Sequence, residues 1–379
     1  MAADLMIKNG NVLDSECEKA EKKDIVLDNG KIIKVGTNLK YDAKQVIDAE
    51  GCIVSPGLVD YHLHLFKGAS DHGIIPDSAL LPNGVTTAVD AGTSGVSTYH
   101  AFRRLTAENT QLRTKALLNI SPIGMLNDMQ HENLDPKYFD EKRMRELFET
   151  YPDDLVGIKL RMSLDVNPEM KEETLYKTIE IAETLGKRLI VHVTNPAMDI
   201  EKMALALRAG DVFCHMFQGK NQSIIDENGK IRNGIIQARE KGVLFDACNG
   251  RSNFDTDVAK KAMQQGFIPD IISTDMTTST LYIQPVISLP FVMSKYLALG
   301  MSLPDVIRKS SLFPAKLLGL DRQIGRIEEG FIGDIAIFKL KKKKVEFVDY
   351  LGKKMVGSEV LVPQATIKDG IIVYRQTDF

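Results

Sequence analysis

The chain has 379 residues, of which 44% are hydrophobic and 26% charged, so it can bury a full core and is not a disordered protein. Its formal net charge of −3 gives no general attraction to nucleic acid or to an anionic membrane, and we expect neither as a partner. The length suits a large domain with a smaller one beside it.

The sequence also bears on location and redox state. No apolar run approaches the roughly 18 residues that span a bilayer, and MAADLMIKNG lacks a basic region followed by an apolar stretch. We therefore expect a cytoplasmic protein. The four cysteines form no CxxC pair, which predicts reduced, mostly buried thiols rather than metal ligands or nucleophiles: Cys17, Cys52, Cys214 and Cys248.

Both ends of the chain predict short strands. Residues 4–14 and 24–36 alternate around Asn-Gly pairs, which are typical of hairpin turns, and GDIAIFKL, KVEFVDYL and TIKDGIIVY near the other end look alike. We expect residues 1–55 and 333–379 to form one small β-sandwich domain, with the lysine-rich run at 339–344 as a solvated hairpin rather than a binding patch.

Between these ends, short β-branched runs alternate with amphipathic helices such as 172–186 and 255–266, which end in glycine. Eight strands alternating with helices predict an α/β fold, a (β/α)₈ TIM-type barrel over residues 56–332. An open doubly wound sheet is the alternative, but no strand leads into a GxGxxG turn. The expected strands are GLVDYHLHL, VTTAVDAG, TKALLNIS, LVGIKLRM, RLIVHVT, DVFCHMF, VLFDACNG and DIISTD.

Residues that bind metals gather at the predicted strand ends, where barrel enzymes have their active sites. His62 and His64 end the first strand and, being two apart, point the same way. Later strands end near His192, His215 and Asp275, and this set suits zinc or a similar cation. The other histidines, for which we predict no metal role, are His72, His100 and His131.

Lys159 on the fourth strand is harder to place, because a lysine inside a barrel beside cations is costly. It could be neutralised by a carboxylate or face outward. We favour a third chemistry, in which the neutral amine adds CO₂ and becomes an anionic carbamate that bridges two metals.

Together, HLH on the first strand, lysine on the fourth, histidines on the fifth and sixth and aspartate on the eighth resemble the binuclear amidohydrolase superfamily. VIDAEGCIVSPGLVDYHLHL and IGRIEEGFIGDIAIF resemble its entry into the barrel and its return to the small domain, so the likeness covers nearly the whole chain. The sequence is most similar to the dihydroorotase and D-aminoacylase branch, and to bacterial proteins often labelled adenine deaminase or dihydroorotase, some of which are deacetylases.

The resemblance implies a role for each ligand. His62, His64 and Asp275 would bind the more buried metal, and His192 and His215 the second. Lys159, as N6-carboxylysine, and a hydroxide would bridge two divalent ions. Zinc is expected, although manganese and iron accept the same ligands. Asp275 would act as general base and then as general acid.

Substrate contacts are placed by position alone. Arg161 shares the inward face of Lys159 and either holds a substrate carboxylate or forms a structural ion pair. The turn at Gly250 could offer backbone N–H groups to the same anion. Members that the chain resembles have a histidine near Asn249, so the substrate preference is open there. Asn195 and Tyr99 could also reach the pocket, although both types of residue more often stabilise loops.

We therefore expect a hydrolase that cleaves an acyl ester or amide of a carboxylate-bearing small molecule, such as an acetylated α-hydroxy acid or an N-acyl amino acid. A cyclic amidohydrolase of the dihydroorotase or hydantoinase kind is the alternative. A purine (adenine) deaminase fits less well, because many such enzymes use one metal without a bridging lysine. A non-enzymatic scaffold conflicts with the complete ligand set. Whether the chain forms a homo-oligomer is left open.

Overall fold

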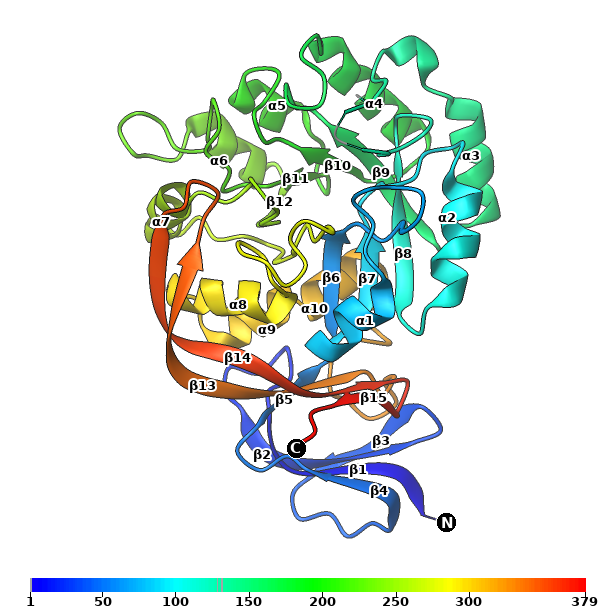
Figure 1. Cartoon of the computed structure of the whole chain (residues 1–379), viewed down its shortest axis with the longest axis vertical. Coiled ribbons are helices and arrows are strands. Elements are labelled where there is room, and N and C mark those ends of the chain that lie inside the picture. Colours follow the sequence, from blue (N-terminus) through cyan, green and yellow to red (C-terminus); the bar gives the residue numbers. More distant parts are fainter. Residues whose placement is uncertain (1, 128, 131) are drawn as a thin grey trace.

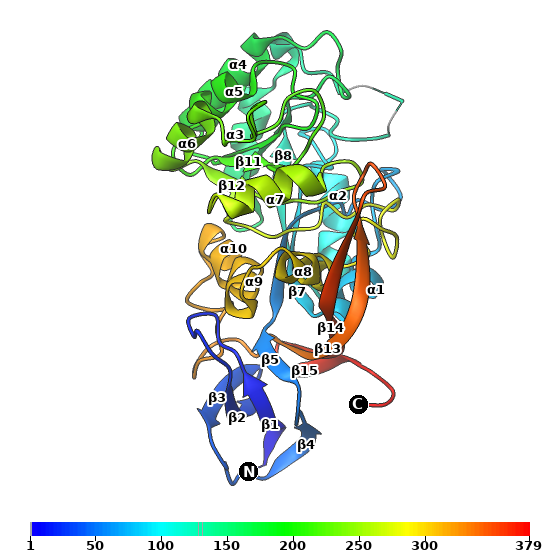
Figure 2. The ribbon, with the colours of Figure 1, turned by 90° about the vertical axis from the view of Figure 1, so that its left-hand side faces the viewer.

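The computed structural model describes residues 2–127, 129–130 and 132–379, and it shows a barrel joined to a β-sheet formed by the two chain ends (Figure 1). In the view turned by 90° the sheet lies below the barrel, with the N-terminus at its far end (Figure 2). His131, for which we predicted no metal role, lies outside the described residues.

The strands of the terminal sheet follow the order β15-β14-β13-β5-β1-β2-β3, and β4 also pairs with β1. β5 belongs to the N-terminal part of the chain and pairs with β13 from the C-terminal part, so both ends build one continuous sheet. The sandwich description stays a prediction. The strands are β1 (Ala3–Val12), β2 (Glu21–Asp28), β3 (Lys31–Gly36), β4 (Ala43–Asp48), β5 (Ile53–Pro56), β13 (Ile335–Val348), β14 (Lys354–Lys368) and β15 (Ile371–Arg375).

The Asn-Gly pairs behave differently from one another. Asn29 and Gly30 both have positive φ, 48° and 77°, and form the predicted tight turn between β2 and β3. The predicted turn at Asn9-Gly10 is wrong, because β1 continues through it with a bulge between Ile7 and Gly10. The lysine-rich run at 339–344 lies in a hairpin as predicted: it is part of the long strand β13, which pairs with β14, and residues 341–344 are exposed.

The barrel strands run parallel in chain order, and seven of them are regular. The eighth, expected at 270–275, is not a regular strand. This segment still closes the barrel, through bridges from Asp246 to Ile271 and from Leu63 to Met276. The strands are β6 (Leu58–Leu63), β7 (Val85–Asp90), β8 (Arg113–Asn119), β9 (Leu155–Arg161), β10 (Leu189–His192), β11 (Val212–Cys214) and β12 (Leu244–Asp246).

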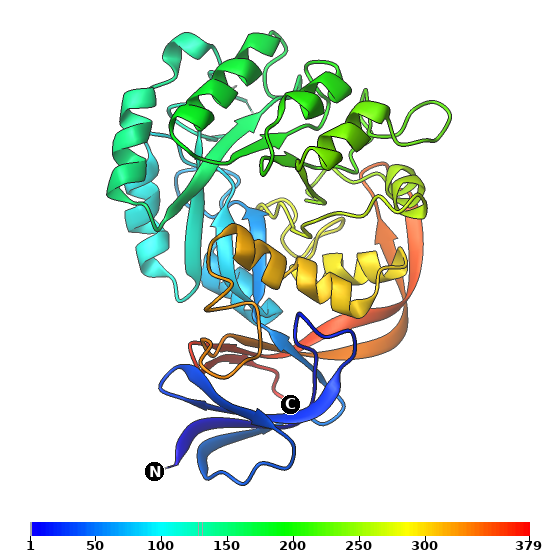
Figure 3. The ribbon, with the colours of Figure 1, turned by 180° about the vertical axis from the view of Figure 1, so that it is seen from behind.

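Helices surround the barrel strands, as the views from both sides show (Figures 1 and 3). Two were predicted closely: α4 and α7 are followed by Gly186 and Gly266, whose positive φ ends each helix. The α-helices are α1 (Pro76–Leu80), α2 (Tyr99–Leu105), α3 (Glu141–Thr150), α4 (Glu172–Thr184), α5 (Ile200–Ala206), α6 (Asn233–Glu240), α7 (Thr256–Gln264), α8 (Leu289–Ala298), α9 (Leu303–Lys309) and α10 (Leu312–Leu317). Short 3₁₀ helices are η1 (Leu81–Asn83), η2 (Ala107–Asn109) and η3 (Pro136–Tyr138).

The two largest apolar clusters among the described residues lie in different parts of the molecule. The larger fills the space between barrel strands and helices, and the smaller lies within the terminal sheet. The long hairpin of β13 and β14 packs along α8 and so ties the sheet to the barrel (Figure 1). None of the helices in the described part of the chain has the length and apolar character that a membrane crossing needs.

Candidate metal centre

The residues predicted from the strand ends converge on one cavity of about 320 Å³. His62 lies on β6, Lys159 on β9 and His192 at the end of β10, and all three line it. Asp275 reaches it from the segment that closes the barrel. His215, just after β11, is fully buried behind His192, with ring centroids 4.3 Å apart.

The first ligand group is close enough to share one cation. Nε2 of His64 lies 3.2 Å from Oδ1 of Asp275, and Nε2 of His62 lies 3.7 Å from the same oxygen. Donor atoms of all three residues fall within 4.8 Å of one another. His215 extends the cluster, with its ring centroid 5.2 Å from that of His62.

Neighbouring groups fix the orientation of two imidazoles. Asp90 accepts a hydrogen bond from the Thr93 hydroxyl, so Thr93 Oγ1 accepts from Nδ1 of His64 at 2.8 Å. His215 donates from Nδ1 to the carbonyl oxygen of Cys248 at 2.8 Å. In each ring Nε2 therefore keeps its lone pair for the site, as in metal-binding histidines held by outer hydrogen bonds.

The residues present fit a metal. Nε2 of His215 is buried and finds no hydrogen-bond partner among the described residues, which is costly for a polar atom unless something binds it there. Burial, followed by the nearby positive groups, lowers the pKa of His62 and His192 well below the usual range. For His215 burial is again the largest cause, and its pKa falls to about 4. Near neutral pH these three imidazoles are therefore uncharged and able to bind a cation.

Asp275 is ionised at neutral pH. Burial would raise the pKa of this carboxyl, but the contact with His64 and the nearby positive charge of Lys159 bring the pKa below its usual value. Its other oxygen, Oδ2, accepts from Nδ2 of Asn253 at 2.7 Å. Asn253 is in turn held by the Thr194 hydroxyl at 2.8 Å.

Lys159 points inward and is 1% exposed, so the alternative in which it faces outward is wrong. Its amine lies 3.0 Å from Nε2 of His62, and within the described chain no carboxylate forms an ion pair with it. Gly92 allows this placement, because a Cβ at that position would lie 2.5 Å from Cβ of Lys159.

A second layer lies on the far side of His62. Nδ1 of this ring is 3.5 Å from Sγ of Cys214 and 3.8 Å from Oδ2 of Asp246. Burial raises the pKa of Asp246 and of Asp60 to about 7, against the hydrogen bonds that each accepts. Among these donors are the hydroxyls of Ser273, which donates to Asp246, and Thr274, which donates to Asp60, so the two acids position the segment that carries Asp275.

Arg161 lines the cavity as predicted, but its Nε pairs with the buried carboxylate of Glu132. Of the two predicted roles of Arg161, the structural ion pair is therefore the one that the structure shows for its Nε atom. The backbone N–H of Gly250 donates to the carbonyl of Thr274 at 2.9 Å, so it does not face an anion, although Arg251 next to it lines the cavity.

Asn195 and Tyr99 are not among the cavity-lining residues. Asn195 donates to the carboxylate of Asp165 at 2.6 Å, and Tyr99 packs at 1% exposure against Phe102 and Tyr151. His72 lines the cavity, whereas His100 contacts the Tyr151 hydroxyl at 3.3 Å.

Sequence reasoning missed several residues that build the cavity. Asn253 was within reach, because it lies beside the turn that we singled out. Lys220 lies in the loop that follows the sixth predicted strand, but no motif singled it out. Gln130, which lines the cavity, and Glu132, which pairs with Arg161, come from a long loop far from any predicted strand end. The cysteines, by contrast, are free as predicted, and Cys52, Cys214 and Cys248 are buried.

Comparison with known proteins agrees with this geometry. The model of the amidohydrolase family matches residues 53–373. A deacetylase from Enterococcus faecalis is 31% identical over 98% of this chain and 99% of its own, and one from Agrobacterium fabrum is 33% identical over 86% and 80%. Solved structures described as an adenine deaminase and a dihydroorotase superpose with TM-scores of 0.91 and 0.90, at 31% and 29% identity, covering 99% of this chain and 100% and 98% of theirs.

The match covers most of the chain, and the ligand-type side chains meet at the carboxyl ends of the barrel strands, where this fold places active sites. The chain belongs to the amidohydrolase family and is a metal-dependent hydrolytic enzyme.

Proposed function

We propose that the enzyme removes the acyl group from an ester or amide of a small molecule that carries a carboxylate, such as an acetylated α-hydroxy acid or an N-acyl amino acid. Support comes from relatives named deacetylase at 31% and 33% identity. The observation that carries the proposal is one cavity that holds both the metal-ligand cluster and the guanidinium of Arg161.

In this proposal the metal ligands divide into two groups. His62, His64 and Asp275 would hold one cation and His192 and His215 the other, with Lys159, as N6-carboxylysine, a ligand to both. Two divalent ions, zinc by preference, would supply Lewis acidity there and would lower the pKa of water toward neutrality. Lys159 suits carboxylation because it is buried and has no carboxylate partner in the described chain.

Asp275 is the residue proposed to move the proton. It is ionised and lies beside the cluster, so it can take a proton from the attacking water and pass it to the leaving oxygen or nitrogen. The amide of Asn253 on Oδ2 fixes the rotation of the carboxylate, so that Oδ1 stays beside the histidines.

Substrate binding is proposed to rest on the positive side chains of the cavity. Arg161, Lys220 and Arg251 line it together with only two carboxylates among the described residues, Asp165 and Asp275. Glu132 contacts Nε of Arg161, and the terminal nitrogens of that guanidinium are the groups we assign to a substrate carboxylate.

The test is proton release from zinc-loaded protein in a pH-stat with each enantiomer of O-acetyl mandelate, with free acetate measured in parallel. We expect fast acetate release from one enantiomer, because a fixed carboxylate contact and a fixed metal centre together select one configuration. Absence of acetate from both enantiomers, in protein with full metal content, would contradict the ester assignment.

A cyclic amidohydrolase is the second candidate, favoured by the likeness to the solved dihydroorotase structure over 99% of this chain. Ring opening of dihydroorotate or a hydantoin also releases a proton but no acetate, so the same apparatus separates the two. Adenine deamination would instead produce ammonia, which is measured directly.

A further inference from the structure

Two buried cysteines, Cys214 and Cys248, each lie in a group of possible metal ligands with His62, but their surroundings differ. Cys52 and Cys214 pack inside apolar clusters, whereas Cys248 belongs to none of those formed by the described residues. Its sulfur also has no hydrogen bond within that part of the chain, although the residue is fully buried. Packing as a small apolar side chain therefore does not account for its position.

The backbone holds Cys248 in place at the end of β12. Its φ is +29°, a value that side-chain-bearing residues rarely adopt and that persists only where the surroundings require it. The N–H of Cys248 donates to Asp246 at 3.1 Å, and its carbonyl accepts from His215. The Cys248 backbone and the His215 ring are thus joined by hydrogen bonds, which fix the position from which the thiol extends.

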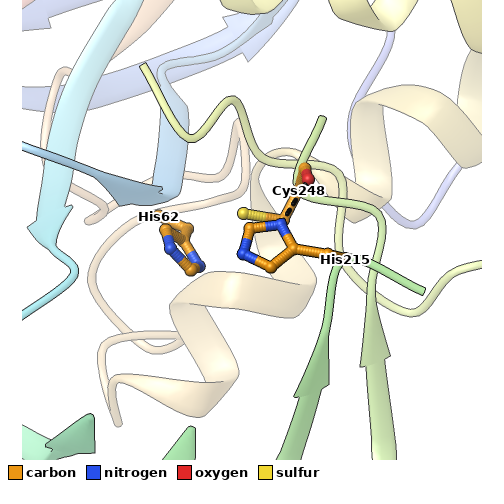
Figure 4. A group of neighbouring side chains, drawn as sticks. All are labelled: His62, His215 and Cys248. Carbon is orange, nitrogen blue, oxygen red and sulfur yellow. Dashed lines mark hydrogen bonds between the residues drawn. The ribbon is translucent and has the colours of Figure 1, made fainter. Parts of the chain in front are cut away.

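Figure 4 shows the sulfur directed toward His62 and His215. One donor atom from each of these three residues lies within 4.8 Å of the other two, and all three residues are buried. Nε2 of His215, the buried nitrogen that already points to a metal in the main cluster, has no partner among the described residues, so an unsatisfied ligand atom lies beside the thiol as well.

A sulfur and two imidazoles are ligands for a softer cation than the carboxylate-containing set beside them. Thiolates favour soft cations, whereas carboxylates suit harder ones. We infer that Cys248, His62 and His215 form a thiolate site for a soft divalent cation such as Cd²⁺, which overlaps the proposed catalytic centre. Binding joins the metal to sulfur, and the thiol proton leaves to solvent.

The overlap has a functional consequence. Each imidazole can bind only one cation at a time. A soft cation bound to Cys248, His62 and His215 therefore removes His62 from the set that includes Asp275, and His215 from the set that includes His192. Soft cations should therefore inhibit the enzyme through Cys248, whichever substrate the enzyme hydrolyses.

The experiment titrates metal-free protein with Cd²⁺ and records the ultraviolet thiolate-to-cadmium absorption band, which needs no turnover. Cys248→Ala should lose the band. It should also bind Cd²⁺ at least about tenfold more weakly, because the loss of a ligand should cost no less affinity than the loss of a residue that only orients one. Cys214→Ala is the matched control, because that thiol is equally buried and also near His62, and it should keep the band.

Circular dichroism checks that both variants are folded. If Cys248→Ala does not fold, a variant with Cys17→Ser, Cys52→Ala and Cys214→Ala decides the question, since its band can come from Cys248 alone. A band that is absent from the unmodified protein, or that disappears with Cys214→Ala and survives Cys248→Ala, would overturn the inference.

Discussion

At the scale of single residues, the metal cluster depends on groups that never touch a metal. Thr93 and Asp90 orient His64, and the Cys248 carbonyl orients His215. Because each imidazole offers only one lone pair when neutral, the hydrogen bond on Nδ1 decides that Nε2 faces the site. The histidines lie at the strand ends, but the hydrogen bonds from neighbouring residues decide which ring nitrogen faces the metal site.

Asp275→Asn should keep much of the bound metal and lose most of the turnover, about 10²-fold or more, because an amide cannot accept the proton. Metal content by elemental analysis and kcat are the measurements. Asp165→Asn is the control, since this second cavity carboxylate pairs with Lys220 at 3.0 Å and has no part in the proposed proton transfer. Unchanged turnover in Asp275→Asn would remove Asp275 from the mechanism.

Arg161→Met should raise KM for an anionic substrate about tenfold or more, with a smaller change in kcat, because a charged hydrogen bond to the substrate is lost. The variant also leaves Glu132 buried without its partner. The double variant with Glu132→Gln corrects for that cost. If both variants bind the anionic substrate as the unmodified enzyme does, Arg161 is only a structural ion-pair partner.

At the scale of elements, the segment just after β7 lies against the Lys159 side chain of β9, two strands away in the sheet, because Gly92 has no side chain. Its φ is +78°, and a Cβ there would lie 2.5 Å from Cβ and 2.8 Å from Cγ of Lys159. The helix-ending Gly186 has a similar φ of +62° but open space around it. Substituting alanine at Gly186 tests backbone strain alone, whereas the same change at Gly92 tests backbone strain together with steric contact at the site.

Gly186→Ala should lower the free energy of unfolding by about 1–2 kcal/mol, the cost of a left-handed backbone for alanine. Gly92→Ala should lower it by more, because the new Cβ also collides with Lys159. Only Gly92→Ala should also reduce metal content, because it displaces Lys159. Urea unfolding and elemental analysis test both parts. Equal metal content in the two variants would show that Lys159 does not need the space beside Gly92.

The regular elements were predictable because their signals are local. Alternating apolar residues gave the strands, and glycines gave the ends of α4 and α7. The prediction of a regular eighth strand was wrong for a reason specific to this barrel. Thr274 donates a hydrogen bond to Asp60, and Ser273 donates one to Asp246. Asp275 has a φ of +52°, which no regular strand allows. The distortion carries Asp275 into the cavity.

At the scale of the whole molecule, α8 links the terminal sheet to the loop beside the site. The Ser294 hydroxyl accepts from the backbone of Leu361 in β14, and the next residue, Lys295, donates to Asn249 and to the carbonyl of Pro285, each at 2.9 Å. Burial lowers the pKa of Lys295 to about 7, so this link includes a lysine that is partly neutral at physiological pH.

Lys295 should make stability depend on alkaline pH. Its pKa is about 10.5 when unfolded and about 7 when folded, so between these values the unfolded chain binds more protons and stability rises with pH. Lys295→Met should remove up to about 1.4 kcal/mol per pH unit from that slope. Urea unfolding between these pH values measures it, and identical slopes would show that Lys295 stays charged in the fold.

The sequence by itself determined the α/β alternation and the ligand-type residues at strand ends, because both follow from local periodicity and from the shared direction of parallel strands. Only the tertiary structure decided that Arg161 meets Glu132, that Asn253 holds Asp275, and that Cys248 faces the metal cluster rather than an apolar core. These contacts join loops and strand ends distant in the chain, whose approach depends on the closed barrel and leaves no periodic signal in either segment.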